Sequence, residues 1–288
     1  KLIEITGLSD ASAGFIILAV LTSAPEIVVA LFAIAQGNPA ISIGDILGSN
    51  VFNIGAVIGV LGIIGYLKTC CTDLLVELTD MLFITALIPL LLVINQYHIL
   101  DIPSPFIGII LLATFLANTY VMARKRTPPI KVNSNHAISR RKKGAVIVTL
   151  LLSFTIIVVA ARLTVNSALD IAIAFGVPPI LIGAKIVALG TSLPEFTVDL
   201  AAVKRGRVQL ALGGILGSNL TNLTLVLGLV LIASPFTVDM NIFIEILPFL
   251  LITTVIFWRS IMRGGVSKAG GAILILTYVL FQILVINV

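Results

Sequence analysis

Long apolar stretches separated by short polar segments make up nearly the whole chain of 288 residues. A helix needs about 20 apolar residues to cross the hydrocarbon core of a bilayer. The stretches lack strand-like alternation, and only helices or closed barrels satisfy every backbone polar group in lipid. The pattern therefore predicts an all-α, polytopic membrane protein with nine transmembrane helices in this chain. They run near residues 11–35, 42–65, 74–95, 103–123, 144–164, 178–203, 209–232, 241–258 and 268–287.

The composition agrees with this prediction and removes several classes of protein. Hydrophobic residues make up 59% of the chain and charged residues only 11%, with a mean hydropathy of +1.18. Soluble domains carry roughly 25% charged residues, so a soluble enzyme, a disordered protein and a nucleic-acid binder are excluded. Cys70 and Cys71 are adjacent, and His98 and His136 lie far apart. We therefore expect no disulfide framework, no histidine metal site and no bound cofactor.

One long polar segment divides the chain into two halves. Residues 124–143 contain eight basic residues, two prolines and no acidic residue, which is typical of a linker. The linker separates residues 1–123, with about four helices, from residues 144–288, with five helices. Because positively charged loops stay in the cytoplasm, we expect the linker on the cytoplasmic side.

The same orientation accounts for nearly every other charge. It places 16 of the 18 basic residues on the inner side, the exceptions being Arg162 and Lys185. The outer turns, near residues 36–41, 95–102, 165–177 and 234–240, contain neither Lys nor Arg. The sequence thus predicts a multi-pass protein of the lipid bilayer, with the plasma membrane as its expected location.

An internal repeat is the strongest signal in the chain. A shift of 169 residues aligns Thr22–Asn53 with Thr191–Asn222 without a gap, and 15 of the 32 positions are identical. Both copies contain Thr-Ser-x-Pro-Glu, followed later by Gly-x-Ile-Leu-Gly-Ser-Asn-x-x-Asn. Apolar residues repeat by chance in such a chain, but Thr, Ser, Pro, Glu and Asn in register do not.

The predicted orientation turns the two copies upside down relative to each other. The turn between the two motif helices is outside in the first copy and inside in the second. Inverted repeats of this kind are typical of transporters with a binding site near the membrane midplane. The shift also predicts a partner for the span near 144–164, about 169 residues earlier. We therefore expect five plus five helices, with the first helix preceding this chain.

Glu26 and Glu195 lie in the middle of their predicted spans. A charge at the bilayer centre costs about 2.5–3.5 kcal/mol, so such residues are functional candidates. No basic residue lies within one helical turn of either glutamate. A structural role as a paired carboxylate is therefore the weaker interpretation.

The residues around the two glutamates offer further oxygen ligands. Pro25 and Pro194 remove a backbone donor, which frees a carbonyl one turn before each glutamate. Hydroxyl and amide side chains recur at helical spacing on the same faces. Calcium takes 6–8 oxygen ligands, whereas zinc and copper favour His or Cys, so we expect a hard cation such as Ca²⁺. The candidate metal ligands are Leu21, Thr22, Ser23, Glu26, Ser49, Asn53, Gly190, Thr191, Ser192, Glu195, Ser218 and Asn222.

These paired motifs resemble the two alpha-repeats of the calcium:cation antiporter superfamily, which includes sodium/calcium and proton/calcium exchangers. The motifs cover about 64 residues, and the inverted duplication with its basic central loop extends the likeness over the chain. The resemblance implies a ten-helix fold with a central ion site and sliding first and sixth helices. It also implies that Glu26 and Glu195 are the principal Ca²⁺ ligands.

The counter-ion is not fixed by the resemblance. Sodium-coupled members commonly have an Asp at one closing Asn position, whereas Asn53 and Asn222 are both neutral. The Thr-Ser form of the first motif, in contrast, resembles the sodium branch. Burial favours a protonated carboxylate and a bound divalent cation favours an ionised one. Two glutamates can therefore exchange one Ca²⁺ for two protons, and we favour H⁺ over Na⁺.

Other embedded charges allow both structural and functional interpretations. Asp45, Lys185 and Glu245 are predicted near the outer ends of their spans, and an Asp45–Lys185 pair is a hypothetical structural lock. Asp199, one turn after Glu195, fits either a relay carboxylate or a solvated vestibule residue.

Competing classes of function find less support in the residues. An intramembrane enzyme is disfavoured because no second Gly-Asp pair, His-Glu-x-x-His motif or phosphate loop is present. A passive cation channel is a remote alternative, and a purely structural protein would not need two buried glutamates. The sequence thus predicts a Ca²⁺ antiporter that is not an enzyme.

Overall fold

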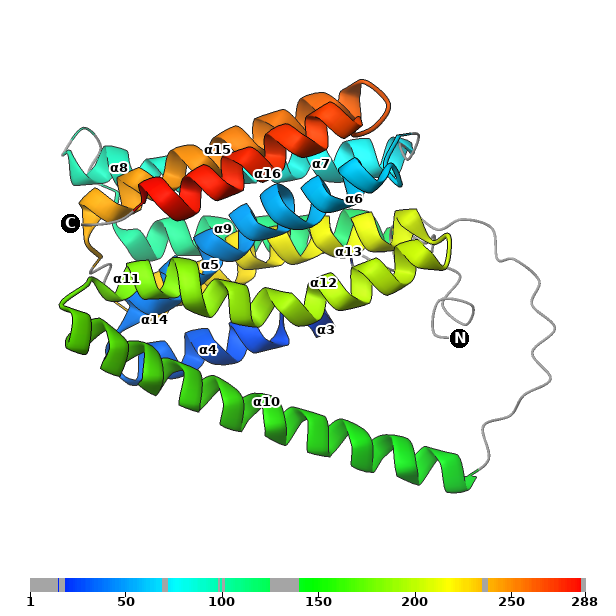
Figure 1. Ribbon diagram of the computed structural model, residues 1–288. Helices are drawn as coiled ribbons and strands as arrows, with labels where there is room; N and C mark the ends of the chain where they lie inside the picture. The colour runs from blue at the N-terminus through cyan, green and yellow to red at the C-terminus, as the bar shows by residue number, and fades with distance from the viewer. Residues whose placement is uncertain are drawn as a thin grey trace.

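The computed structural model describes residues 15, 19–68, 72–97, 99, 102–124, 140–234 and 238–285. All regular elements within these residues are helical, which confirms the predicted all-α fold (Figure 1). The elements are α3 (Ala19–Thr22), α4 (Ala24–Ala35), α5 (Pro39–Val51), η2 (Phe52–Ile58), α6 (Gly59–Ile64), α7 (Asp73–Ala86), α8 (Leu90–Gln96), α9 (Ser104–Arg124), α10 (Arg140–Phe175), α11 (Pro179–Ile182), η3 (Gly183–Val187), α12 (Ala188–Lys204), α13 (Val208–Thr221), η4 (Asn222–Val226), α14 (Leu227–Ala233), α15 (Met240–Met262) and α16 (Lys268–Leu284).

These elements match the predicted spans. Among the described residues, seven helices are long and apolar enough to cross a membrane, and Ala24–Ala35 and Lys268–Leu284 are shorter apolar helices. Three of the seven consist of α-helices joined end to end through the π-helical turns η2, η3 and η4. Residues 11–14 and 16–18 of the first predicted span, and most of the central linker, lie outside the described residues.

The helix after the linker is longer than the sequence pattern predicted. The predicted span ended near residue 164, whereas α10 continues to Phe175 and its apolar span is Thr155–Phe175. The sequence predicted a turn near residues 165–177, but no Gly or Pro occurs between residue 164 and Gly176, so the helix continues. Gly176 then has a φ of +64°, the left-handed conformation that commonly ends a helix.

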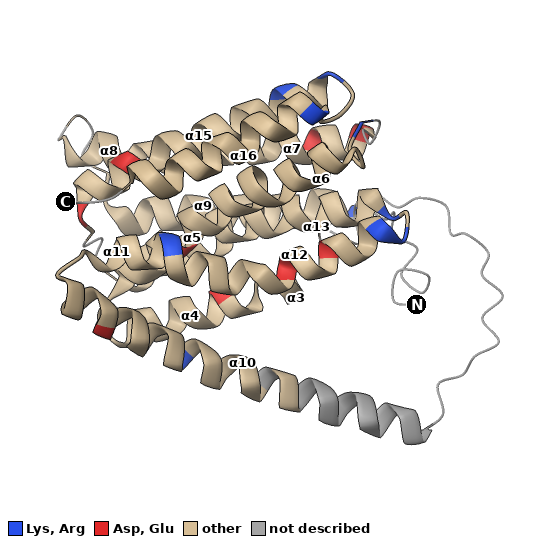
Figure 2. Ribbon diagram, viewed as in Figure 1, with Lys and Arg blue, Asp and Glu red and all other residues tan. Residues whose placement is uncertain are grey.

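The basic turns lie together at one end of the helices. Lys and Arg residues gather where α12 meets α13 and where α15 meets α16 (Figure 2). This placement agrees with the prediction that these turns share one side of the membrane. Which side they face stays a prediction.

The second helix of each motif lies in the centre of the molecule. In an 18-residue apolar stretch of each of the spans Pro39–Ile64 and Val208–Ala233, 83% of the residues are buried, compared with 22% in Thr155–Phe175 of α10. Each central span changes to a π-helical turn next to its closing asparagine, Asn53 or Asn222. The two copies of the repeat therefore share a local backbone distortion as well as a sequence motif.

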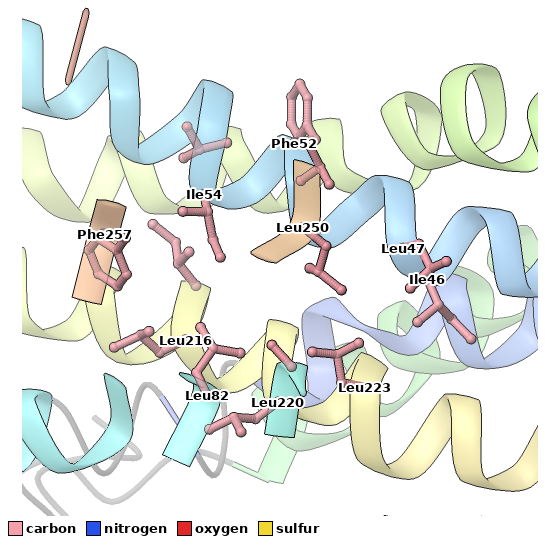
Figure 3. Packing of buried hydrophobic residues seen from close by; sticks show 14 of the residues in the cluster. Ile46, Leu47, Phe52, Ile54, Leu82, Leu216, Leu220, Leu223, Leu250 and Phe257 are labelled. Carbon is pink, nitrogen blue, oxygen red and sulfur yellow. The ribbon is translucent and has the colours of Figure 1, made fainter. Parts of the chain in front are cut away.

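A continuous apolar core fixes the two central spans relative to each other. Side chains of α5 and η2 pack with those of α13 and η4, and α7 and α15 close the cluster (Figure 3). Buried members of this cluster include Ile46, Leu47, Phe52, Ile54, Leu82, Leu216, Leu220, Leu223, Leu250 and Phe257. Interiors of this kind are close-packed, so they hold polar groups on the adjoining helix faces in place.

Glycines let α5 and the α11–η3 segment meet backbone to backbone. A Cβ added to Gly44 would lie 2.1 Å from the carbonyl oxygen of Ile180. A Cβ added to Gly48 would lie 2.1 Å from the carbonyl oxygen of Ala184. A Cβ on Gly183 would lie 2.2 Å from the carbonyl oxygen of Ile41. Gly44 and Gly48 therefore permit close helix packing.

We expect Gly48→Ala to lower the melting temperature of the detergent-purified protein. The added methyl group has no space, so α5 and η3 must separate, and overpacking typically costs about 1–3 kcal/mol. Gly190→Ala is the matched control, because no atom lies within 4 Å of a Cβ at that position. Equal melting temperatures for the two variants would contradict the proposed backbone contact.

Candidate cation-binding site

The two glutamates of the repeat lie in the interior, and each directly follows a proline in its helix. Glu26 is in α4, just after the break between α3 and α4, and is fully buried. Glu195 is in α12, directly after Pro194 within that helix, and is 3% exposed. Leu21 and Gly190 lie about one turn before them, at exposed positions of the chain.

Side chains from both repeats surround Glu195. Ser218 Oγ donates a hydrogen bond of 2.7 Å to Oε1 of Glu195. Asn53 Nδ2, from the other repeat, donates to Oε2 at 2.9 Å and lies 3.1 Å from Asn219 Oδ1. Both carboxylate oxygens of Glu195 therefore have protein donors.

Two hydroxyl pairs connect the repeats in a symmetric way. Thr22 Oγ1 and Ser218 Oγ are 3.0 Å apart, and Thr191 Oγ1 and Ser49 Oγ are 3.4 Å apart. Under the 169-residue shift, Thr22 corresponds to Thr191 and Ser218 corresponds to Ser49, so the two pairs are equivalent. The structure thus brings together, from both repeats, hydroxyl groups that the sequence assigned to one site.

Asp45 breaks this symmetry. Its Oδ1 accepts hydrogen bonds from Thr191 Oγ1 at 3.0 Å and from Ser49 Oγ at 3.3 Å. Symmetry would pair Ser49 with Glu26, as Ser218 pairs with Glu195. The position equivalent to Asp45 in the second repeat is Gly214, which has no side chain that could compete with Glu195 for the hydroxyl of Ser218.

Glu26 consequently has no hydrogen-bond partner at either carboxylate oxygen, although Thr191 and the charges of Glu195 and Asp45 are close enough to act on it. Native proteins leave few buried polar groups unsatisfied. Among the described residues, several unsatisfied buried polar atoms lie in this region. This indicates a place for a cation that protein oxygen atoms bind. Among the candidate ligands, Asp45 and the neighbouring asparagines Asn50 and Asn219, the unpartnered buried atoms are Ser23 Oγ, both Oε atoms of Glu26, Asp45 Oδ2, Asn50 Oδ1, Ser192 Oγ, Asn219 Nδ2, and Oδ1 and Nδ2 of Asn222.

The ligand set consists largely of oxygen. The described part of the chain holds no group of three His, Cys, Asp or Glu residues close enough to bind one metal ion. A bound cation would therefore depend on hydroxyl, amide and backbone oxygens besides carboxylates. Ca²⁺ and Na⁺ accept such hard, mixed oxygen ligands, whereas zinc does not favour them.

The expected Asp45–Lys185 lock is wrong. Lys185 Nζ donates a 2.8 Å hydrogen bond to the backbone carbonyl of Gln282, while Asp45 bonds to Thr191 and Ser49. Asp45 therefore belongs to the site and was missed there, although its position one turn before Ser49 was a usable signal. Asp199 is only 4% exposed, which disfavours the solvated vestibule alternative.

A mostly apolar cavity of about 550 Å³ reaches the site between α4, α10 and α12. Its walls include Pro25 and Pro194, next to the two glutamates, and Thr191, which bonds to Asp45. The residues of α10 that line it extend from Ile156 to Ile171. The cavity therefore lies beside a contact in which apolar side chains of α10, such as Val165 and Ala168, pack against Val28 and Val29 of α4.

The sequence of this chain matches a known family of membrane proteins. The profile of the family described as sodium/calcium exchanger protein matches residues 1–124 and 145–287. The sodium/calcium exchanger MaX1 of Methanosarcina acetivorans is 27% identical, over 96% of this chain and 89% of that protein. The putative antiporter CaxA of Alkalimonas amylolytica is 32% identical over 78% and 71%, respectively.

A solved structure also has the same fold. The sodium-calcium exchanger NCX_Mj, in crystals soaked with 2.5 mM Na⁺ and 0.1 mM Sr²⁺, superimposes with a TM-score of 0.71 at 25% sequence identity. The match covers 99% of this chain and 90% of that structure.

We expect different effects of Glu26→Gln and Glu195→Gln on stability in Ca²⁺-free and Na⁺-free buffer. Glu26→Gln removes a buried charge that has no partner, so the melting temperature should stay constant or rise. Glu195→Gln replaces an acceptor oxygen with an amide that faces the donors of Ser218 and Asn53, so it should lower stability by about 1–3 kcal/mol. Thermal melts of both purified variants check this order, and a lower melting temperature for Glu26→Gln would contradict it.

Proposed function

The chain belongs to the sodium/calcium exchanger family, and on that premise we propose that it exports Ca²⁺ across a membrane in exchange for a monovalent cation. The observation that carries the proposal is the pair of buried glutamates, one from each repeat, without a basic partner in the described structure. Two ionised carboxylates match the charge of one divalent cation. The protein is a multi-pass transporter rather than an enzyme, and exchange of this kind needs no cofactor.

Glu26 and Glu195 would be the principal ligands, with oxygen atoms of both repeats completing the shell. Ca²⁺ requires 6–8 oxygens in a flexible arrangement. The hydroxyls of Thr22, Thr191 and Ser218 already lie within this network. The remaining proposed ligands are Ser23, Ser49, Asn53, Ser192 and Asn222, with the carbonyl oxygens of Leu21 and Gly190.

Alternating access would depend on motion of α10 against a rigid centre. In an apolar 18-residue stretch of α10, 22% of the residues are buried, whereas the share is 83% in each of the central spans that contain Asn53 and Asn222. The cavity beside Thr191 lies between α10 and the motif helices. A weakly packed helix can slide past this site more readily than a helix in the core. We propose the plasma membrane as its location, with the basic linker in the cytoplasm.

Two counter-ions fit the site. Protons follow from the sequence argument, because two buried glutamates can exchange one Ca²⁺ for two protons. Asp45 changes that argument, since it adds a third buried carboxylate that contacts Thr191 and Ser49. Three buried carboxylates in one region balance the positive charge of more monovalent cations than two carboxylates do. For this reason we place sodium first and keep protons as the second candidate.

The test is Ca²⁺ uptake into sealed proteoliposomes, driven separately by an outward sodium gradient and by an outward proton gradient. We expect saturable uptake with the sodium gradient, and a loss of at least tenfold in both Glu26→Gln and Glu195→Gln, because each removes a principal ligand. Glu245→Gln is the matched control, since it makes the same chemical change at an exposed position of α15. It should transport like the unmodified protein.

Each other outcome assigns a different function. Uptake driven only by the proton gradient would make protons the counter-ion. Flux without either gradient would indicate a channel. Undiminished flux in both glutamine variants would contradict the antiporter proposal itself.

A further inference from the structure

A cavity of about 770 Å³ lies beside the turn between α15 and α16, at the end of the helices where the basic turns gather (Figure 2). Lys68, Arg259 and Arg263 are among the residues that line it. None of the described residues that line it is acidic, and none is a proposed ligand of the exchanged ions. The proposed exchange site therefore does not account for this cavity.

Backbone contacts hold residues of both repeats at the cavity. The amide of Val266, in the turn before α16, donates a 2.8 Å hydrogen bond to the carbonyl oxygen of Leu67. Gly265 has a φ of +151°, and a Cβ there would lie 2.3 Å from the same oxygen and 2.7 Å from the carbonyl oxygen of Lys68. Only glycine permits this conformation and this approach. The fold therefore places Lys68, just after α6, next to the two arginines of the second repeat.

The positive charges around the cavity are not neutralised by the protein. The side chains of Lys68, Arg259 and Arg263 are exposed, and none of them forms an ion pair within the described part of the chain. The hydroxyl of Ser267, which also lines the cavity, accepts a 3.1 Å hydrogen bond from the amide of Gly270 and keeps its own proton for another acceptor. Positive charges that converge on a hollow without acidic partners favour an anion there.

The rest of the wall is apolar and leads into the membrane. Ile256 of α15 and Ile273 of α16 line the cavity. One turn further from the basic end on the same two helices, Ile252 is 47% exposed and Leu276 is 57% exposed. A free inorganic anion would gain nothing from such a surface. A phospholipid would use both parts, with its phosphate at the basic residues and an acyl chain along the two helices.

We propose that this cavity binds one anionic phospholipid, whose phosphate oxygens contact Lys68, Arg259 and Arg263. Basic pockets between transmembrane helices bind anionic headgroups, and arginine forms paired hydrogen bonds with phosphate. The bound lipid would connect the end of α6 with the α15–α16 turn and so join the two repeats at their surface. The inference is independent of the counter-ion and of the ligands of the exchanged ions.

Native mass spectrometry of the purified protein in neutral detergent, titrated with phosphatidylglycerol, tests the proposal. We expect one tightly bound lipid, and binding of zwitterionic phosphatidylcholine at least about tenfold weaker. Arg259→Gln/Arg263→Gln should weaken phosphatidylglycerol binding about thirtyfold, because each basic residue contributes about fivefold near an anionic lipid. Lys204→Gln/Arg205→Gln is the matched control, since it removes the same charge from exposed positions of another basic turn. Its affinity should stay within about twofold of the unmodified protein.

A steric variant tests the cavity without a change in charge. Ala269 lines the cavity at an exposed position of α16, so Ala269→Trp should fill the space and weaken binding at least about tenfold. This variant also decides the matter if the double arginine variant does not fold. Binding equal to that of the unmodified protein would overturn the proposed site.

The remaining outcomes concern the identity of the anion. Thermal melts should show a higher melting temperature with phosphatidylglycerol and no change with inorganic phosphate. An equal rise with inorganic phosphate would assign the cavity to a free anion and overturn the lipid proposal. Equal weakening by the two double variants, or equal binding of phosphatidylcholine, would show that a specific anionic headgroup is not recognised, and would overturn it as well.

Discussion

The absence of counter-charge around the buried glutamates is the constraint on which the other features of this molecule depend. Glu26 is fully buried and unpartnered, and Glu195 is held by the neutral donors of Ser218 and Asn53 within the described structure. Charges in a low-dielectric interior are stable only when they are paired, protonated or bound to a cation. Because the described residues place no basic side chain against either glutamate, the ions of the proposed exchange would complete the site. The same electrostatic need would give the proposed site its affinity for a cation.

Packing of the surrounding helices makes this arrangement possible. Gly44, Gly48 and Gly183 bring α5 and η3 into backbone contact, so that Thr191 and Ser49 meet across the boundary between the repeats. Larger side chains at these glycines would separate the hydroxyl groups from the carboxylates. The apolar core around α5 and α13 fixes both central helices, while α10 at the periphery stays weakly packed. In the proposed mechanism, a firmly packed centre with a less buried outer helix would be the physical basis for alternating exposure of one site.

Much of this account follows from the sequence, and the remainder depends on contacts between helices. Hydropathy predicts the spans, and the identical Thr, Ser, Pro, Glu and Asn residues locate the motifs, because both signals are local. The predicted end of the span near residue 164 was wrong, because no Gly or Pro follows that residue before Gly176 and α10 continues to Phe175. The role of Asp45 was missed for a different reason. Its own helix places it on the face of Ser49, but its contact with Thr191 depends on how α5 crosses η3.

The central claim is that one Ca²⁺ ion binds between the two repeats, with Glu26 and Glu195 as shared ligands. Long-wavelength anomalous diffraction from crystals of the protein grown with Ca²⁺ tests this most directly. The account predicts an anomalous peak within about 2.3–2.6 Å of carboxylate oxygens from both residues, the usual range for Ca²⁺ ligands. A Ca²⁺ peak that contacts neither glutamate, or only one of them, would contradict it.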